Sequence, residues 1–304
     1  MSAPLPFSSV AVLGPGLLGG SLALAVRDYM PGVSIRLWAR RSATLDEART
    51  LGVGSLLTND IGEAVDGAEL VVLATPIGAF RELAERALPS LASTCVVTDV
   101  GSVKAYVHRT TGAFLHENGR QFIGSHPMAG SEKQGIGAAR ADLFRDAGIV
   151  LTNDHGAPQH SLNRLKEFWR VLGGRCHEMP AGRHDRTVAR ISHMPHVLAA
   201  LAAHNAPAGD VAPGDLRRLA STGFRDTTRV CSGAPAMWAD ILWENDVAIR
   251  EILTHCADDL RQLIYLLETG DKEAVCRWLT EAKDARETIL PITGESSPDA
   301  PPLQ

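Results

Sequence analysis

Residues 10–19 read Val10-Ala-Val-Leu-Gly-Pro-Gly-Leu-Leu-Gly19, and this segment is the strongest indication of the fold of the N-terminal half. The apolar run at 10–13 is typical of a buried strand, and the residues from 17 to 26 are predicted to form a helix. Between them lies a G-x-G-x-x-G pattern, in the strand–loop–helix context that it requires. Its glycines permit a tight turn, the approach of a pyrophosphate to the backbone and close helix–strand packing. We therefore predict a dinucleotide-binding loop formed by Gly14, Gly16, Leu17, Leu18 and Gly19, with a ligand-free tight turn as the alternative.

The turn after the second expected strand, residues 35–39, bears on the choice between NAD and NADP. An Asp or Glu at the end of this strand would bind the ribose 2′-hydroxyl of NAD. The sequence instead reads Ala39-Arg-Arg-Ser42, and guanidinium groups suit a 2′-phosphate, which arginine binds bidentately. We predict NADP as the cofactor, with NAD as the alternative, and a solvated basic turn as the non-binding interpretation. The residues assigned to this part of the cofactor site are Arg40, Arg41, Ser42, Thr75 and Pro76.

Short apolar segments alternate with helical ones up to residue 180. Strands are expected at 10–13, 35–39, 70–74, 95–98, 122–124, 148–152 and 176–179. Helices are expected at 17–26, 43–50, 81–87, 103–116 and 161–172. This alternation indicates an α/β domain whose parallel sheet is covered by helices on both faces.

No further strand is expected after Pro180. Helices are predicted at 185–204, with a kink at Pro195, at 237–268 and at 271–288. The second of these would be about 45 Å long at 1.5 Å per residue. Its apolar residues recur at three- and four-residue steps: Ile249, Ile252, Leu253, Cys256, Leu260, Leu263, Ile264 and Leu267. We expect a second copy of the chain to cover this stripe and form a homodimer.

These patterns divide the chain into three parts. Residues 7–180 are the expected dinucleotide-binding domain, and residues 181–293 the expected helical substrate-binding and dimerisation domain. Residues 294–304, GESSPDAPPLQ, are rich in proline and serine and are expected to be disordered.

The composition narrows the classes of function. With 45% hydrophobic and 21% charged residues and a net charge of −5, the 304-residue chain is typical of a globular protein, with no nucleic-acid partner expected. The sequence contains no run of 18 apolar residues, so no membrane-spanning helix is predicted. The five cysteines form no Cys-x-x-Cys pair, which argues against a disulfide framework or a structural zinc site. A reducing cytoplasm is the expected location.

Polar motifs follow two of the later strands and recur in the helical half. Residues 98–104 read TDVGSVK and residues 124–132 read GSHPMAGSE, both at strand ends, where open α/β sheets bind ligands. The helical half contains His184-Asp185, residues 192–196 (SHMPH) and residues 223–229 (GFRDTTR).

Taken together, these motifs resemble prephenate dehydrogenase and its relatives, the arogenate and cyclohexadienyl dehydrogenases of tyrosine biosynthesis. The resemblance covers residues 8 to 290, and the motifs occur in the order found in the family. It implies a Rossmann-like domain followed by an all-α dimerisation domain, in agreement with the pattern of elements. It also implies an oxidative decarboxylation, in which hydride leaves C4 of the cyclohexadiene ring for the nicotinamide and the ring carboxylate leaves as CO₂.

The resemblance assigns roles to seven residues. His126 matches the catalytic histidine, and an imidazole is a natural acceptor for the C4 hydroxyl proton near neutral pH. Ser102 matches a serine that binds the substrate or the histidine, with a helix N-cap as the structural alternative. Arg229 matches the arginine that holds a substrate carboxylate. The other matching pocket positions are His196, Glu132, Arg225 and Trp238.

Several alternatives stay open at this point. His193 and His196 have the spacing of a metal pair, but no third ligand is suitably placed and Pro195 lies between them, so no metal is predicted. Trp238 fits either helix packing or a contact across a dimer. A 3-hydroxyacid dehydrogenase would need a lysine in the helical half, where Lys272 and Lys283 both come late. A cofactor-sensing regulator without turnover is a non-enzyme alternative. Prephenate is the expected substrate, with arogenate as the alternative.

Overall fold

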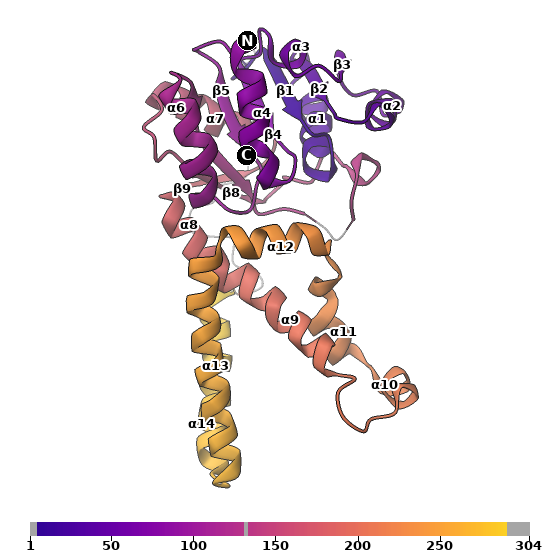
Figure 1. The fold of residues 1–304 in the computed structure, drawn as a ribbon, viewed down its shortest axis with the longest axis vertical. Coiled ribbons are helices and arrows are strands. Elements are labelled where there is room, and N and C mark those ends of the chain that lie inside the picture. The colour runs from indigo at the N-terminus through magenta and orange to yellow at the C-terminus, as the bar shows by residue number, and fades with distance from the viewer. Residues whose placement is uncertain (1–4, 131–132, 291–304) are drawn as a thin grey trace, which may run out of the picture. The chain divides into compact units, whose positions relative to one another are not determined.

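The computed structural model describes residues 5–130 and 133–290, and its N-terminal part is built on a six-stranded parallel sheet (Figure 1). The strand order is β3-β2-β1-β4-β5-β6. The strands are β1 (Ser9–Leu13), β2 (Ser34–Trp38), β3 (Leu56–Thr58), β4 (Leu70–Leu73), β5 (Val96–Asp99) and β6 (Gln121–Phe122). The chain moves outward in one direction from β1 and in the other from β4. Ligands of open α/β sheets bind at such a reversal, outside the carboxyl ends of the strands.

Helices cover both faces of this sheet, as the sequence predicts. Successive side chains of a strand point to opposite faces, so Val10 and Val12 of β1 join one buried cluster while Ala11 and Leu13 join another. The first cluster contains residues of α1 (Leu17–Tyr29), α2 (Ser42–Thr50) and α7 (Gln159–Val171). The second contains residues of α3 (Ile61–Val65), α4 (Phe80–Ala87) and the helical segment 105–117. The elements β3 and α3, of three and five residues, were not predicted.

The last three strands form a separate sheet, which corrects the expectation of a single parallel one. In this sheet β7 (Gly124–Pro127) pairs antiparallel with β8 (Gly148–Thr152), and β8 pairs in parallel with β9 (Arg175–Glu178). The chain leaves the first sheet after the backbone N–H of Ile123 donates to Val97 at 3.0 Å. The next inward N–H, that of Ser125, donates instead to the Asp99 carboxylate at 3.1 Å. His126 is thereby placed at the carboxyl end of β5.

Two helical segments contain π-helical turns. The helix expected at 103–116 consists of α5 (Ala105–Val107), the π-helical η3 (His108–Gly112) and α6 (Ala113–Glu117). The helix expected at 185–204 consists of α8 (Ala181–Val188), the π-helical η5 (Ala189–His193) and α9 (Met194–Asn205). Pro195 lies in the first turn of α9, where its missing N–H is best tolerated.

The helix expected at 237–268 is broken into α12 (Pro235–Glu244) and α13 (Asp246–Glu268). The break falls at Asn245, whose φ of −109° and ψ of 28° are not helical. Its side-chain amide donates to the backbone oxygen of Asp185 at 2.9 Å and lies 3.2 Å from Nδ1 of His193. A tertiary contact therefore ends a helix that the sequence pattern would continue.

The remaining helical elements are short, apart from α14. They are η1 (Ile77–Ala79), η2 (Leu88–Ser90), η4 (Ile136–Ala138), α10 (Pro213–Leu219), α11 (Thr222–Thr228), η6 (Arg229–Ser232) and α14 (Lys272–Ile289). None of the helices in the described ranges combines the length and the apolar character needed to cross a bilayer.

Contacts within the chain define two units, residues 1–249 and 250–304. In the second unit, large apolar side chains of α13 and α14 are exposed, among them Leu260, Ile264, Leu267 and Leu279. The tail at 294–304 lies outside the described residues.

Candidate active site

The glycine loop has the geometry that a dinucleotide needs. Gly14 has a φ of +103°, and a Cβ there would lie 2.6 Å from Thr75. A Cβ on Gly19 would lie 2.4 Å from the backbone oxygen of Gly14, so α1 packs closely on the strand only because this residue is glycine. Gly16, at the N-terminus of α1, has open space where its Cβ would be. The loop therefore leaves room for a pyrophosphate at a helix N-terminus.

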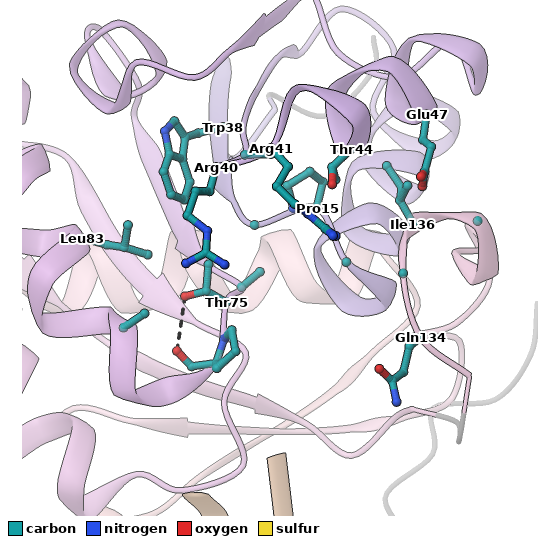
Figure 2. A pocket seen from close by; sticks show the side chains of 18 of the residues that line it. Pro15, Trp38, Arg40, Arg41, Thr44, Glu47, Thr75, Leu83, Gln134 and Ile136 are labelled. Atoms are coloured by element: carbon teal, nitrogen blue, oxygen red, sulfur yellow. Dashed lines mark hydrogen bonds between the residues drawn. The ribbon is translucent and has the colours of Figure 1, made fainter. Parts of the chain in front are cut away.

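A cavity with a volume of about 700 Å³ opens beside this loop (Figure 2). Gly14 and Gly16 line it together with Arg40 and Arg41 from the end of β2. Further lining comes from Thr75 and Pro76 after β4, from Trp38, Leu83 and Arg86, and from Gln134 and Ile136. The carboxylates of Glu47 and Glu82 also line it, but they come from helices rather than from the end of β2. This cavity fits a nicotinamide dinucleotide in size and in donor groups.

Four of the predicted cofactor residues lie outside the lining of this cavity, and one of them is Gly19, which packs α1 against the loop. Leu17 and Leu18 are partly buried against the core, so their side chains support α1. Ser42 is exposed, and its hydroxyl donates to Asn59 Oδ1 at 3.1 Å.

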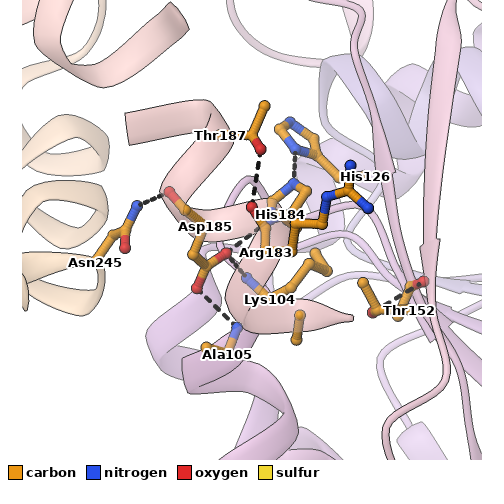
Figure 3. A network of polar contacts seen from close by, with 12 residues as sticks. Lys104, Ala105, His126, Thr152, Arg183, His184, Asp185, Thr187 and Asn245 are labelled. Atoms are coloured by element: carbon orange, nitrogen blue, oxygen red, sulfur yellow. Dashed lines mark hydrogen bonds and ion pairs between the residues drawn. The ribbon is translucent and has the colours of Figure 1, made fainter. Parts of the chain in front are cut away.

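His126 is the end of a chain of hydrogen bonds that starts at Asp185 (Figure 3). Its Nδ1 lies 2.8 Å from Nε2 of His184, and Nδ1 of His184 lies 2.7 Å from Oδ1 of Asp185. Because a carboxylate only accepts, His184 carries its proton on Nδ1 and its Nε2 accepts from His126. His126 then carries its proton on Nδ1, and its Nε2 is left with a free lone pair. The arrangement thus presents a base.

The protonation equilibrium of His126 agrees with this assignment. Burial, and then the neighbouring His184, lower the pKa of His126 well below its usual value. The ring is therefore neutral at physiological pH and able to take up a proton.

Asp185 also anchors the segment that follows β5. Its carboxylate oxygens accept from the backbone N–H groups of Lys104 and Ala105, each at 2.8 Å. This carboxylate therefore satisfies the N-terminus of α5, a role that the alternative interpretation gave to Ser102. The structure shows Ser102 three residues before α5, partly buried and without an N-cap bond.

A buried ion pair supports the residue that precedes His126. Lys104 Nζ contacts Asp99 Oδ2, and both side chains are fully buried. Burial lowers the pKa of Lys104 and raises that of Asp99, and their mutual attraction opposes both shifts. Asp99 also accepts from the N–H of Ser125, whose hydroxyl lies 2.7 Å from that of Thr98. Trp169 Nε1 also donates to the Ser125 hydroxyl at 3.2 Å, so the residue before His126 is fixed by three polar contacts.

His196 and Trp238 form a second group within the same chain. Their rings stack with centroids 3.5 Å apart and an interplanar angle of 13°. Nδ1 of His196 is buried and has no hydrogen-bond partner among the described residues. Burial lowers the pKa of His196, while the Val230 backbone opposes that shift. Arg229, the residue before Val230, is exposed at the start of η6, and Arg225 is exposed on α11.

Glu132, the remaining predicted pocket residue, lies outside the described residues. Gln134, two positions later, lines the cofactor cavity. Within the described ranges, no group of three or more His, Cys, Asp or Glu side chains is arranged to hold a metal ion. His193, considered as a metal ligand with His196, is paired with Asn245.

Several residues of this site had no predicted role. His184 and Asp185 form one of the polar motifs of the helical half, but their position in the sequence does not show that they are hydrogen-bonded to His126. Lys104 and Asp99 belong to the TDVGSVK segment. Their residue types alone do not show that they pair, and the pairing becomes evident only from the burial of both side chains. The sequence did not indicate a structural role for Asn245, because this residue falls inside a continuous helical pattern.

Two sequence profiles match most of the chain. One, described as the nucleotide-binding domain of prephenate dehydrogenase, matches residues 22–178, and the other, described as its dimerization domain, matches residues 180–281. The cyclohexadienyl dehydrogenase of Zymomonas mobilis is 34% identical over 283 residues, which cover 92% of this chain and 95% of that protein.

Solved structures agree with these matches. Prephenate dehydrogenase from A. aeolicus, in complex with hydroxyphenyl propionate and NAD⁺, superposes with a TM-score of 0.85 at 28% identity, over 95% of this chain and 100% of that one. Synechocystis arogenate dehydrogenase superposes with a TM-score of 0.78 at 30% identity, over 93% and 100%. The chain is therefore a nicotinamide dinucleotide-dependent dehydrogenase that belongs to the prephenate dehydrogenase family.

Proposed function

We propose that this enzyme catalyses the oxidative decarboxylation of prephenate to 4-hydroxyphenylpyruvate, with NADP⁺ as the hydride acceptor. The observation that carries the proposal is the chain of hydrogen bonds from Asp185 through His184 to His126, which leaves a basic Nε2 on His126. The names of the relatives, which include prephenate, cyclohexadienyl and arogenate dehydrogenases, support the substrate class.

His126 takes the proton of the C4 hydroxyl in this mechanism. When bound, the nicotinamide supplies the acceptor for the hydride that leaves C4. As the C4–O bond becomes a carbonyl, the bond between C1 and its carboxylate breaks, CO₂ leaves and its electron pair completes the aromatic ring. His126 returns the proton to the resulting phenolate oxygen, so it is a base and then an acid in one turnover. His184 and Asp185 stabilise the imidazolium that forms in between.

The groups that hold the substrate come from the helical half. Arg229 suits a substrate carboxylate because its guanidinium is exposed and offers paired donors. His196 has a buried nitrogen without a hydrogen-bond partner among the described residues and is fixed by stacking on Trp238, which suits a polar contact with the substrate. Ser102, Arg225 and Glu132 are assigned to the same pocket on the family resemblance.

We also propose NADP rather than NAD as the preferred cofactor. Two guanidinium groups and no carboxylate stand at the end of β2, and both arginines line the cavity. A 2′-phosphate bound there would be paired with positive charge, whereas a 2′-hydroxyl would meet no carboxylate in the sequence at that strand end.

The helical part, residues 181–293, is proposed as the substrate-binding and dimerisation domain that follows a dinucleotide-binding domain at residues 7–180. The match to a dimerization domain and the exposed apolar side chains of α13 and α14 support a homodimer.

One assay tests the substrate. NADPH formation at 340 nm, a wavelength set by the reduced nicotinamide, is followed after adding prephenate or arogenate, in the wild type and in Glu132→Gln. We expect kcat/KM to be higher for prephenate, because no ammonium then has to be paired in the pocket. A wild type about tenfold better with arogenate, a difference of roughly 1.4 kcal/mol, would make arogenate the substrate. If that preference disappears in Glu132→Gln, this carboxylate is the partner of the ammonium.

A further inference from the structure

The nicotinamide half of the cofactor has a defined direction in this fold. The pyrophosphate belongs at Gly14 and Gly16, between β1 and β4, and the adenosine half extends toward Arg40 and Arg41 at β2. The other nucleoside must therefore extend over the carboxyl ends of β4 and β5. The segment after β4, Thr75 to Ala79, contributes Thr75, Pro76 and Ala79 to the cavity wall. Ile77 of the same segment packs on Gly101 after β5, where a Cβ would lie 2.9 Å from it.

Glu244, the last residue of α12, faces this segment. Its Oε1 lies 3.9 Å from the position of a Cβ on Gly78, and no other described heavy atom from outside the Gly78 segment lies within 4 Å of that position. Its Oε2 is buried and has no hydrogen-bond partner among the described residues. The next residue, Asn245, is bonded to Asp185, so Glu244 is held beside the residues that orient His126. A carboxylate in such surroundings is an acceptor in need of a donor.

The protein supplies no cation to this carboxylate in the surroundings that the structure describes. The charged neighbour that acts on it is Asp240, one turn earlier on the same helix, which is also negative. The facing segment from Thr75 to Ala79 contains no ionisable side chain. Burial, followed by Asp240, raises the pKa of Glu244 to about 7. The group thus ionises in the physiological range and has both acceptor oxygens available.

We propose that the Glu244 carboxylate accepts hydrogen bonds from the hydroxyl groups of the ribose that carries the nicotinamide. Two carboxylate oxygens match the two adjacent hydroxyls of a ribose, and such charge-assisted bonds are the strong ones. The contact would join the helical half to the cofactor next to the reacting carbon. The inference rests on the nicotinamide dinucleotide site described above.

The proposal predicts that cofactor binding is linked to proton release. Hydroxyl donors favour the ionised carboxylate, so binding lowers the pKa of Glu244 and affinity rises with pH through neutrality. The dissociation constant for NAD, which lacks a titrating 2′-phosphate, is measured by calorimetry without substrate at several pH values from pH 6 to pH 8. We expect the wild type to bind roughly five- to tenfold more tightly at pH 8, as a single group of this pKa requires. Glu244→Gln, which is nearly isosteric, should change by less than about twofold between these pH values and bind roughly tenfold more weakly than wild type at pH 8.

Two further variants test whether the pH dependence comes from Glu244. Glu117→Gln, at an exposed position on α6, is the matched control and should behave like the wild type. Asp240→Asn removes the neighbouring negative charge, so the midpoint of the pH dependence should move to lower pH. An unchanged midpoint in Asp240→Asn, or the same pH dependence in Glu244→Gln as in the wild type, would overturn the proposal.

An analogue separates the ribose from the carboxamide. The 3-acetylpyridine analogue of NAD keeps the ribose but has no amide N–H, so the wild-type pH dependence should persist with it. Its loss would mean that the carboxamide, not the ribose, is the donor, and the proposal would be wrong. Failure of the wild type to bind any of these dinucleotides would contradict the cofactor site itself, which is a different result from binding without the pH dependence.

Discussion

The Asp185 carboxylate has two tasks that belong to different parts of the protein. It accepts two backbone N–H groups at the start of α5, and it holds His184 by the ring nitrogen opposite His126. The first task fixes the loop that carries Ser102, and the second fixes the tautomers of both histidines. One side chain thereby sets the geometry of both assigned catalytic residues.

Replacing Asp185 by Asn should lower kcat with prephenate by roughly 10²–10⁴-fold, while cofactor affinity stays within about twofold. An amide can donate to His184 and so favours the wrong tautomer, which removes the lone pair from His126 Nε2. Asp154→Asn is the matched control, because Asp154 accepts from the first N–H of α8 but does not contact the histidines. Equal losses in both variants would show that Asp185 only stabilises helices.

The arginines at the end of β2 should decide the cofactor. In Arg40→Ala/Arg41→Ala, kcat/KM for NADP should fall by roughly 10–100-fold, the worth of one or two charge-assisted contacts, while that for NAD changes little. Arg49→Ala, on the exposed face of α2, should leave both values unchanged. Wild-type enzyme that uses NAD as well as NADP would contradict the proposed preference.

Among single residues, the sequence correctly predicted the placements that follow from local sequence pattern. Gly14, Gly16 and the two arginines line one cavity because a strand–helix–strand unit pairs β1 with β2 in parallel. The pairing of His126 with His184 joins residues that are 58 positions apart, and no spacing rule predicts it. The bond from the Ser42 hydroxyl to Asn59 was likewise not predictable from spacing, because Asn59 follows a different strand, β3.

At the scale of elements, two π-helical turns each place a histidine in the interior. His108 begins η3 and His193 ends η5, and burial is the main cause that lowers the pKa of each to about 4. His108 lies 2.7 Å from the hydroxyl of Thr152, and His193 contacts Asn245. Both rings are therefore neutral in the folded protein.

These two histidines predict a loss of stability in acid. Between pH 6.5 and about 4 the unfolded chain binds more protons than the folded one, so the free energy of unfolding falls as the pH falls through this window. Each histidine contributes up to about 3 kcal/mol over the full window. Urea unfolding at pH 7, 6 and 5 measures the free energy of unfolding, and His193→Asn should make it depend less on pH. A free energy of unfolding that stays constant or rises on acidification would contradict the burial of neutral rings.

Each departure from the sequence prediction has a physical cause that local pattern does not show. The apolar period continues through Asn245, so local pattern predicts one helix, and the contact with Asp185 that divides it is tertiary. β3 and α3 are too short to show a period. The second sheet contains strands that were expected, but their pairing depends on the chain leaving β5 after Ile123.

At the scale of the whole molecule, the exposed apolar side chains of α13 and α14 predict a dimer. Light scattering at micromolar concentration should give about 65 kDa, twice the 32.5 kDa of one chain. Leu260 and Ile264 are 53% and 55% exposed, so Leu260→Glu/Ile264→Glu should shift the mass toward the monomer. Gln262→Glu adds a charge to the same helix and should remain dimeric. A wild-type mass near that of one chain would refute the homodimer.

The most direct test of the whole account is the rate of His126→Asn with prephenate and NADP, measured beside its affinity for NADP. We expect the cofactor to bind as in the wild type, because His126 does not line the cofactor cavity, while kcat falls by roughly 10²–10⁴-fold through loss of the base. A variant that keeps nearly full kcat would show that the hydrogen-bonded chain from Asp185 does not end at the catalytic base.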